Sequence, residues 1–278
     1  MLETAERLVA FEASTGNSTE AVTQRKRMAL LSARAALPAG ETLTVPPPVH
    51  APTVGHRTAR TDLMLGRRNG QSLIELSLRP AYHELLDPED GFQRGAAIQF
   101  GKLVLGRSAR GAVQLERLTP IEIASLSPRE PLLSARSWRV DMGVQRSAHA
   151  GANGRRPLGL SVHGGPGAAW EWGPGAHTLA YAFLDNQISW DRSLPAHPWA
   201  LGTGRAVGLL SDVSADLRVQ AEAWGRGYLQ SQPMEAGAQL GARWRLNSDW
   251  NLNARCQWRA RQEAARSREC LLGAQRYW

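Results

Sequence analysis

The sequence has little of what defines several common protein classes. Only 2 of its 278 residues are Cys, which excludes a disulfide-stapled miniprotein and a zinc module built on cysteines. No uninterrupted apolar run approaches the ~18 residues of a membrane-spanning helix, and the mean hydropathy is −0.35. Walker, Rossmann, G-x-S-x-G and H-E-x-x-H motifs are also absent. These absences leave open a membrane β-barrel, whose strands carry much weaker signals.

Lysine is scarce too, although the chain is basic. Lys+Arg exceed Asp+Glu by 33 − 25 = 8, but Lys26 and Lys102 are the only lysines, so 33 − 2 = 31 of the cations are arginines. These arginines are scattered along the chain and form no basic stripe of the kind that binds phosphate backbones. We therefore expect no nucleic-acid partner. The alternative, a basic nucleic-acid module, predicts an affinity that falls steeply with salt.

The N-terminal part divides into two segments. Residues 1–41 form a helical linker region, in which a break at Thr15-Gly16-Asn17 predicts a helical hairpin within Leu2–Leu37. Residues 42–58 are a Pro-rich linker, because consecutive prolines cannot join a helix or an inner strand. The first ten residues lack the basic start and apolar core of a secretory signal.

Residues 59–278 show strand periodicity. Asn69-Gly70 separates two alternating runs and is a strong hairpin signal. Within Trp250–Arg261, apolar residues at even positions alternate with Asn, Gln and Arg at odd positions. About twelve such segments, most of ~10–13 residues, can be counted, which is longer than typical soluble strands. We predict an all-β fold, an antiparallel outer-membrane-type barrel of about twelve strands.

The composition of the two faces predicts which one points outward. About twelve strands enclose a lumen wider than side chains can fill, and alanine is too small to fill it. We therefore expect Ala, Leu, Val and Trp outside against lipid, and Arg, Glu, Gln and Asn around a wet interior. Aromatic residues belong at the two membrane interfaces. The predicted interface aromatics are Trp244, Trp250 and Trp278 beside one set of strand ends, and Trp258 near the other.

The connection lengths fit this orientation in the C-terminal half. Short turns at 212–214 and 247–249 share the end with Trp278, and longer connections at 225–233 and 262–267 lie at the opposite end. This is the asymmetry of short periplasmic turns and longer outer loops. Pro80–Arg94 breaks the rule, since it is long but falls on the short-turn side. Either the strand count is wrong there or that end carries docking loops.

The two cysteines are predicted to face each other. A hairpin centred at Glu263 places Cys256 and Cys270 directly opposite, since 256 + 270 = 2 × 263. Two interpretations remain open, a disulfide or two small apolar residues on the outer wall. Thiol catalysis is not expected, because no His or acid shares that face of the hairpin.

Two further segments carry residues capable of chemistry. His83, Glu84 and Asp87 belong to an acidic loop that could hold a hard cation, although it lacks the alternating oxygen ligands of a calcium loop, and turn chemistry explains it equally well. The segment His163–Gly167 resembles an oxyanion-hole stretch, but we interpret it as a glycine-rich strand end and turn. We assign no catalytic, cofactor or metal-binding residue.

Two stretches carry a family resemblance. The first is Gly66–Leu76 with Arg79–Pro88, and the second runs from Pro120 to Gly143. Both resemble the C-terminal domain of the Lnb-like envelope proteins of Gram-negative bacteria. The resemblance covers roughly Thr58–Trp278, and the preceding helices are similar to that family's inter-domain linker.

The resemblance implies that a signal peptide and a periplasmic lipoprotein-acyltransferase-like catalytic domain precede this part of the protein. Neither lies in this chain, which fits a fragment or a shortened reading frame better than a cytoplasmic protein. We therefore expect a non-catalytic barrel in the outer membrane, with its N-terminal segment in the periplasm, that contacts outer-membrane lipid and positions the upstream domain. The alternative is a barrel enzyme acting on lipid acyl groups, with His83 or His163 as its base.

Overall fold

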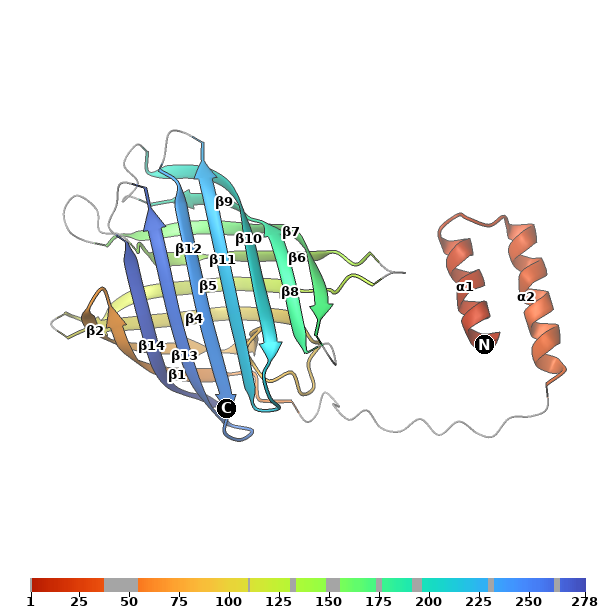
Figure 1. Cartoon of the computed structure of the whole chain (residues 1–278), viewed down its shortest axis with the longest axis horizontal. Helices are drawn as coiled ribbons and strands as arrows, with labels where there is room; N and C mark the ends of the chain where they lie inside the picture. Colours follow the sequence, from red (N-terminus) through yellow and green to blue (C-terminus); the bar gives the residue numbers. More distant parts are fainter. Residues whose placement is uncertain are drawn as a thin grey trace. The chain divides into compact units, whose positions relative to one another are not determined.

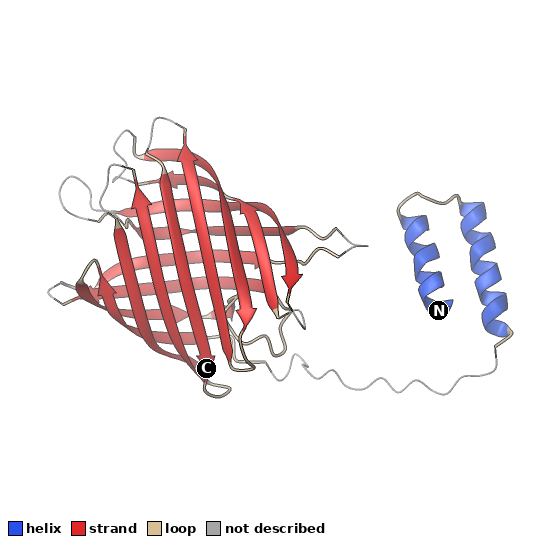
Figure 2. Cartoon of the chain, viewed as in Figure 1, coloured by secondary structure: helices blue, strands red, loops and turns tan. Residues whose placement is uncertain are grey.

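The structure is a computed structural model that describes residues 2–37, 55–109, 111–130, 134–148, 156–173, 177–191, 197–229, 233–262 and 266–278. The chain divides into two compact units, Met1–Pro48 and Val49–Trp278. The first is helical and the second consists of strands (Figures 1 and 2). Most of the predicted Pro-rich linker, residues 42–58, lies outside the described residues.

The first unit is a helical hairpin, as its sequence predicts. Helices α1 (Leu2–Ser14) and α2 (Glu20–Ala35) pack against each other and are joined by an ion pair between Lys26 and Glu12 of 2.5 Å. Thr19 is the N-cap of α2, but its side chain makes no capping hydrogen bond. Within the described residues, no helix is long and apolar enough to cross a bilayer.

The second unit is a closed antiparallel barrel. Its strands are β1 (Arg60–Arg68), β2 (Gln71–Arg79), β3 (Ala81–His83), β4 (Ala96–Ser108), β5 (Gln114–Ser125), β6 (Ser137–Arg146), β7 (Leu158–Trp172), β8 (Thr178–Leu184), β9 (Asn186–Trp190), β10 (Trp199–Asp212), β11 (Leu217–Tyr228), β12 (Glu235–Arg245), β13 (Trp250–Arg261) and β14 (Ser267–Tyr277).

Twelve strand positions make up the wall, which confirms the predicted fold. β8 and β9 both lie between β7 and β10 and form one strand interrupted at Asp185, while β3 pairs only with β4, so 14 − 2 = 12 positions remain. Pairing of β1 with β14 closes the ring, with Arg60 opposite Tyr277. Barrel closure leaves no sheet edge unpaired.

The barrel has two distinct ends. We call the end where β1 begins and β14 ends the proximal end, and the opposite end the distal end. The connections β10–β11 and β12–β13, residues 213–216 and 246–249, lie at the proximal end, and the longer connections β11–β12 and β13–β14 lie at the distal end. The predicted asymmetry of the C-terminal half is therefore confirmed.

Side chains alternate across the wall as predicted. Leu240 and Leu252 are 49% and 39% exposed on the outer surface, whereas Arg243 is only 3% exposed on the inner one. Asn251, next to Leu252, is fully buried. In β12 and β13, the residues that a soluble barrel would turn inward therefore face outward, and the lumen receives the charged and amide groups.

The prediction for His163–Gly167 is wrong. These residues form no strand end or turn but lie in the middle of β7, where Gly164 is opposite Val140 of β6 and Asn186 of β9. A Cβ on Gly164 would lie 2.1 Å from the carbonyl oxygen of Arg139. Glycine is required here because the neighbouring backbone approaches too closely for any side chain.

Candidate functional site

The long connection between β3 and β4 folds into the barrel at its proximal end. Its Leu85 and Leu86 pack against a buried apolar cluster on the inner face of β7, β8 and β10. The cluster consists of Leu126, Ala169, Leu179, Tyr181, Phe183 and Leu210. We call residues 84–95 the plug. The strand count was therefore right, and the part of Pro80–Arg94 that follows β3 folds into the barrel.

Asp87 at the centre of the plug is fully buried and binds several wall strands. Its Oδ1 accepts hydrogen bonds from Arg60 of β1 at 2.7 Å, from the Tyr277 hydroxyl of β14 at 2.6 Å, and from Arg243 of β12. Its Oδ2 accepts from Arg79 of β2 at 2.5 Å and from the backbone N–H of Glu84 at 2.8 Å. One carboxylate thus ties the plug to four wall strands.

Four further contacts, made by Arg218 and Glu84, extend this network. Arg218 of β11 donates to the backbone carbonyl of Asp87 at 3.1 Å and pairs with Glu89 at 2.9 Å. Glu84 accepts from Arg60 and from Arg243, at 2.8 and 2.9 Å. We call Asp87, Glu84 and their cationic and phenolic partners the Asp87 hub.

The two carboxylates of the hub are surrounded by cations. Burial alone would raise the pKa of Asp87, but Arg79, Arg60 and Arg243 hold that pKa well below its ordinary range. Burial would likewise raise the pKa of Glu84, but Lys102, Arg60 and Arg243 hold that pKa well below its usual value. The neighbouring cations therefore hold both carboxylates in the ionised form, in which they form ion pairs.

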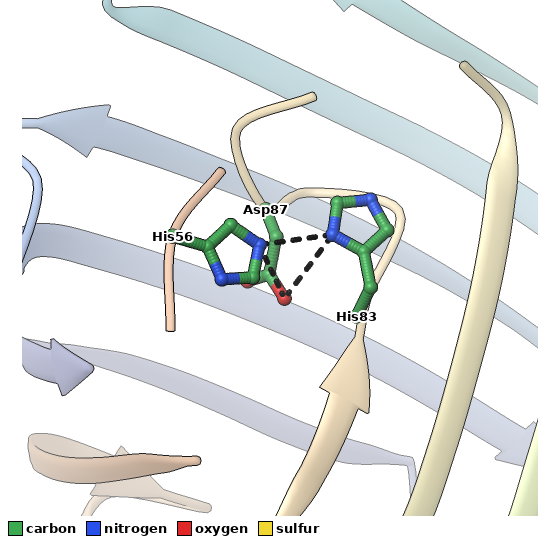
Figure 3. Close-up of side chains that lie close together, drawn as sticks. All are labelled: His56, His83 and Asp87. Atoms are coloured by element: carbon green, nitrogen blue, oxygen red, sulfur yellow. Dashed lines mark hydrogen bonds and ion pairs between the residues drawn. The ribbon is translucent and has the colours of Figure 1, made fainter. Parts of the chain in front are cut away.

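Two histidines lie against the hub (Figure 3). The Nε2 of His56 and the Nδ1 of His83 are 2.9 Å apart and lie 3.8 and 3.9 Å from Asp87 Oδ2. The Phe92 ring stacks on both imidazoles, with centroids 4.5 and 4.2 Å away. Burial lowers the pKa of His56, and it lowers the pKa of His83 to about 3, so both rings are neutral at ordinary pH.

These three residues have the donor types of a metal site, since one ligand atom from each lies within 4.8 Å of the others. Their surroundings do not fit a cation. The Asp87 carboxylate already accepts five hydrogen bonds, and three of the donors are guanidinium groups. A divalent ion would displace those donors and face uncompensated positive charge. The arrangement is therefore a structural ion-pair hub.

The rest of the lumen is polar and contains a cavity of about 270 Å³. Its lining carries charges of both signs, which pair across the interior: Arg255 contacts Glu75 and Glu269 at 2.9 and 3.1 Å. Arg139 contacts Glu222 at 2.8 Å. Several buried polar atoms here have no protein partner, as expected where water fills the space. The polar lining is what the strand alternation predicts for the interior.

Neither histidine considered as a base lies beside lipid or a nucleophile. His163 points into the lumen, with its ring nitrogens 3.8 Å from Asp141 and 3.5 Å from Asp185. His83 is sealed beneath the plug. Within the described residues, the polar contacts of these rings are to carboxylates and to His56. The geometry gives no support to the enzyme interpretation.

Tryptophan is distributed toward the strand ends of the outer surface. Nine of the ten tryptophans are exposed, and among them Trp244, Trp250 and Trp278 lie at the proximal end and Trp258 near the distal end. The remaining exposed ones are Trp138, Trp170 and Trp172 at the proximal end, and Trp190 and Trp199 at the distal end. Trp224 instead points inward, beneath the Arg226 guanidinium.

The two cysteines are directly opposite each other in β13 and β14 and form a disulfide on the outward face of the wall. Arg68 and Arg255 hold Glu269, the residue beside Cys270, on the inward face. The disulfide therefore joins two strands that already pair, on the side away from the lumen.

Sequence reasoning identified His83, Glu84 and Asp87 but missed their partners. Arg60, Arg79, Arg243 and Tyr277 are inward-facing residues near the proximal ends of their strands. The β1–β2 hairpin places Arg60 opposite Arg79, and barrel closure places it opposite Tyr277. Three inward-facing arginines at one end of the lumen need a counter-charge. Their concentration there was the feature of the sequence that could have indicated a buried carboxylate.

Comparison with known proteins gives a family and a set of similar folds. The sequence model of a family described as a domain of unknown function, DUF7840, matches residues 49–277. No curated protein matches the chain.

Among solved structures, the COG4313 outer membrane channel from Pseudomonas putida F1 is 8% identical with a TM-score of 0.46, covering 87% of this chain and 100% of that chain. The NanC porin is 11% identical with a TM-score of 0.44, covering 78% and 99%. The KdgM porin in complex with oligogalacturonate is 7% identical with a TM-score of 0.43, covering 79% and 99%. At these identities, the neighbours' ligands do not carry over to this chain.

Proposed function

We propose that the chain, which belongs to the DUF7840 family, is an outer-membrane anchor: a lipid-embedded β-barrel whose lumen is closed by its own plug. The outward apolar surface with tryptophans toward both ends supports the membrane location. The single observation that carries the closed lumen is the Asp87 hub, in which one fully buried carboxylate joins the plug to β1, β2, β12 and β14.

The anchor serves an N-terminal partner. The resemblance to Lnb-like envelope proteins supports an upstream periplasmic catalytic domain similar to lipoprotein acyltransferases, with the helices of residues 1–41 as the connection to it. The first strand begins at the proximal end, next to the plug and the short turns. In this proposal the proximal end faces the periplasm, and the barrel holds the upstream domain close to lipid and lipoprotein substrates.

Fractionation of cells tests the membrane location. The chain is expressed behind a signal peptide, and we expect it in the outer-membrane fraction after a carbonate wash. Leu240→Glu places a charge on the outward face and should prevent stable insertion, whereas Gln239→Glu, one residue away on the inward face, should insert normally. Recovery of the wild-type chain as a soluble periplasmic monomer would refute the anchor.

Conductance across a planar bilayer tests the closed lumen separately. The hub and the packed plug predict no steady open pore for the inserted wild-type protein. A stable, reproducible conductance with inserted wild-type protein would show that the plug leaves a path, and the lumen would then be a channel. This result would leave the membrane location untouched, so the two parts of the proposal fail independently.

A further inference from the structure

The outer wall carries one arginine in the middle of its apolar band. Among the described wall strands, the other outward-facing arginines lie at a strand end or one residue from it: Arg67, Arg107, Arg146, Arg268 and Arg276. Arg276 packs on the Trp250 ring near the proximal end. These positions are the interfaces, where a cationic side chain remains hydrated. Arg205 does not follow this rule.

Arg205 lies at the centre of β10. It is the seventh of the 14 residues between Trp199 and Asp212 and stands opposite Leu184 on one side and Gly225 on the other. The side chain is exposed on the outer surface, and no described residue forms an ion pair or hydrogen bond with it. An unpaired cation facing hydrocarbon is costly at mid-depth, so such a residue marks a functional site.

The surroundings of Arg205 are polar on one side only. Toward the distal end, the Thr203 hydroxyl donates to Asn186 Oδ1 at 2.8 Å, so two more polar groups face outward beside the arginine. Gly225 and Gly227 stand opposite Arg205 and Thr203, and a Cβ at either glycine would meet nothing within 4 Å. Open space therefore adjoins the polar groups.

Toward the proximal end, the neighbours of Arg205 on the same face are apolar. Val207 and Leu209 follow it along β10, and both are exposed on the outer surface. The long arginine side chain therefore gains solvation by extending toward the distal end, over Thr203 and the two glycines. This asymmetry fixes the leaflet from which a ligand approaches.

We propose that Arg205, with Thr203 and Asn186, binds the phosphate group of an anionic lipid from the leaflet at the distal end. This inference rests on the membrane location proposed above. A phosphate supplies the negative charge and the acceptor oxygens that a guanidinium binds in a bidentate manner, and the side-chain amide nitrogen of Asn186, whose Oδ1 accepts from Thr203, adds a third donor. The open strip over Gly225 and Gly227 gives the head group room against the wall.

A lipid fits this site better than a second copy of the chain. A two-fold contact centred on this patch would place Arg205 against the same arginine of the other copy, and like charges in a low-dielectric region repel strongly. A lipid phosphate instead supplies the missing counter-charge. Binding of an embedded partner protein is the remaining outcome, and the experiment separates it.

The test measures lipid binding to the purified full chain by native mass spectrometry after extraction in a mild detergent. The probes are phosphatidylglycerol and phosphatidylcholine, titrated separately. We expect the wild-type protein to prefer phosphatidylglycerol about tenfold, the effect of one charge-assisted contact. Arg205→Leu should abolish this preference and Arg205→Lys should retain part of it. Arg276→Leu, the matched control, also removes an outward arginine and should retain all of it.

Flotation with lipid vesicles precedes the titration. A wild-type chain that does not float overturns both the anchor and this site, because the wall then meets no lipid. A chain that floats while Arg205→Leu keeps the full preference overturns the site alone. A photo-crosslinker placed at position 205 reports the occupant in cells: a lipid adduct supports the proposal, and an adduct with a protein overturns it.

Discussion

The two halves of the lumen use the same residue types in opposite ways. At the proximal end, Asp87, Arg60 and Arg79 are almost fully buried and the plug excludes water from them. Farther along, Arg255 keeps about a third of its side chain exposed to the cavity while pairing with Glu75 and Glu269. An arginine–carboxylate pair in this barrel therefore holds the plug in place where the plug covers it. Elsewhere, the same kind of pair lines the polar cavity.

Removal of the hub carboxylate should give the largest effect. Asp87→Ala leaves Arg60, Arg79 and Arg243 buried without their counter-charge, and we expect the free energy of unfolding to fall by about 3–5 kcal/mol. The shift is measured by urea titration of the heat-modifiable gel mobility of the folded barrel. Asp216→Asn, which removes the half-exposed partner of Arg245, should cost about 0.5 kcal/mol. Equal losses in the two variants would contradict the distinction between an arginine–carboxylate pair that the plug covers and one that is exposed.

The second effect is a loss of stability at the proximal end in acid. The lowered pKa values of His56 and His83, the latter about 3, mean that the folded state resists protonation, whereas the unfolded chain takes up protons below pH 6.5. Stability is therefore full above pH 6.5 and falls as the pH drops toward 3, by about 1.4 kcal/mol per pH unit for each fully shifted histidine. Urea midpoints between pH 7 and 4.5 measure this decline.

A histidine variant serves as the control for the pH series. His83→Gln keeps a polar group beside His56 but removes the titration, so the decline between pH 7 and 4.5 should become shallower. His163→Gln replaces the histidine of the open lumen and should leave the contribution of the plug unchanged. An identical pH profile for wild type and His83→Gln would show that the stacked pair does not set the acid limit.

The smallest of the three effects should come from the open lumen. Glu269→Gln removes one partner of Arg255 and of Arg68, but Arg255 keeps Glu75, Arg68 keeps Glu116, and water reaches the site. We expect a loss of about 1–2 kcal/mol, below that of Asp87→Ala in the same urea assay. A loss as large as that of Asp87→Ala would mean that the distal lumen is as dry as the hub.

The barrel itself was predictable because its periodicity is local. Alternation such as that of Trp250–Arg261 shows which face of a strand is polar, and no knowledge of the partner strands is needed to see it. About twelve such strands must close into a barrel to leave no edge unpaired. The inverted arrangement followed from size, since alanine cannot fill a lumen of this width. The tight hairpin at Asn69-Gly70 was local as well.

The hub was not predictable in the same way. Its contacts join Asp87 to residues as far away as Arg243 and Tyr277, and nothing in the chain near Asp87 reports whether a loop turns outward or into the lumen. The excess length of Pro80–Arg94 was visible, and the Asn69-Gly70 hairpin places Arg60 opposite Arg79, but the register that brings Arg60 and Tyr277 together follows only from closure. The prediction for His163–Gly167 was wrong for a related reason. Glycine is needed there because the neighbouring backbone approaches closely, and not because the chain turns.

The pairing of the first wall strand with the last has a consequence for biogenesis. Tyr277, which donates to Asp87, is the last residue of β14, and the Trp278 amide donates to the Ala59 carbonyl at 2.9 Å. A nascent or truncated chain that lacks β14 can neither complete the ring nor satisfy the central carboxylate. Such contacts between distant parts of the sequence form late. Both the closure of the wall and one of the plug's contacts thus depend on β14, so its loss would expose the edge of β1 and weaken the attachment of the plug at the same time.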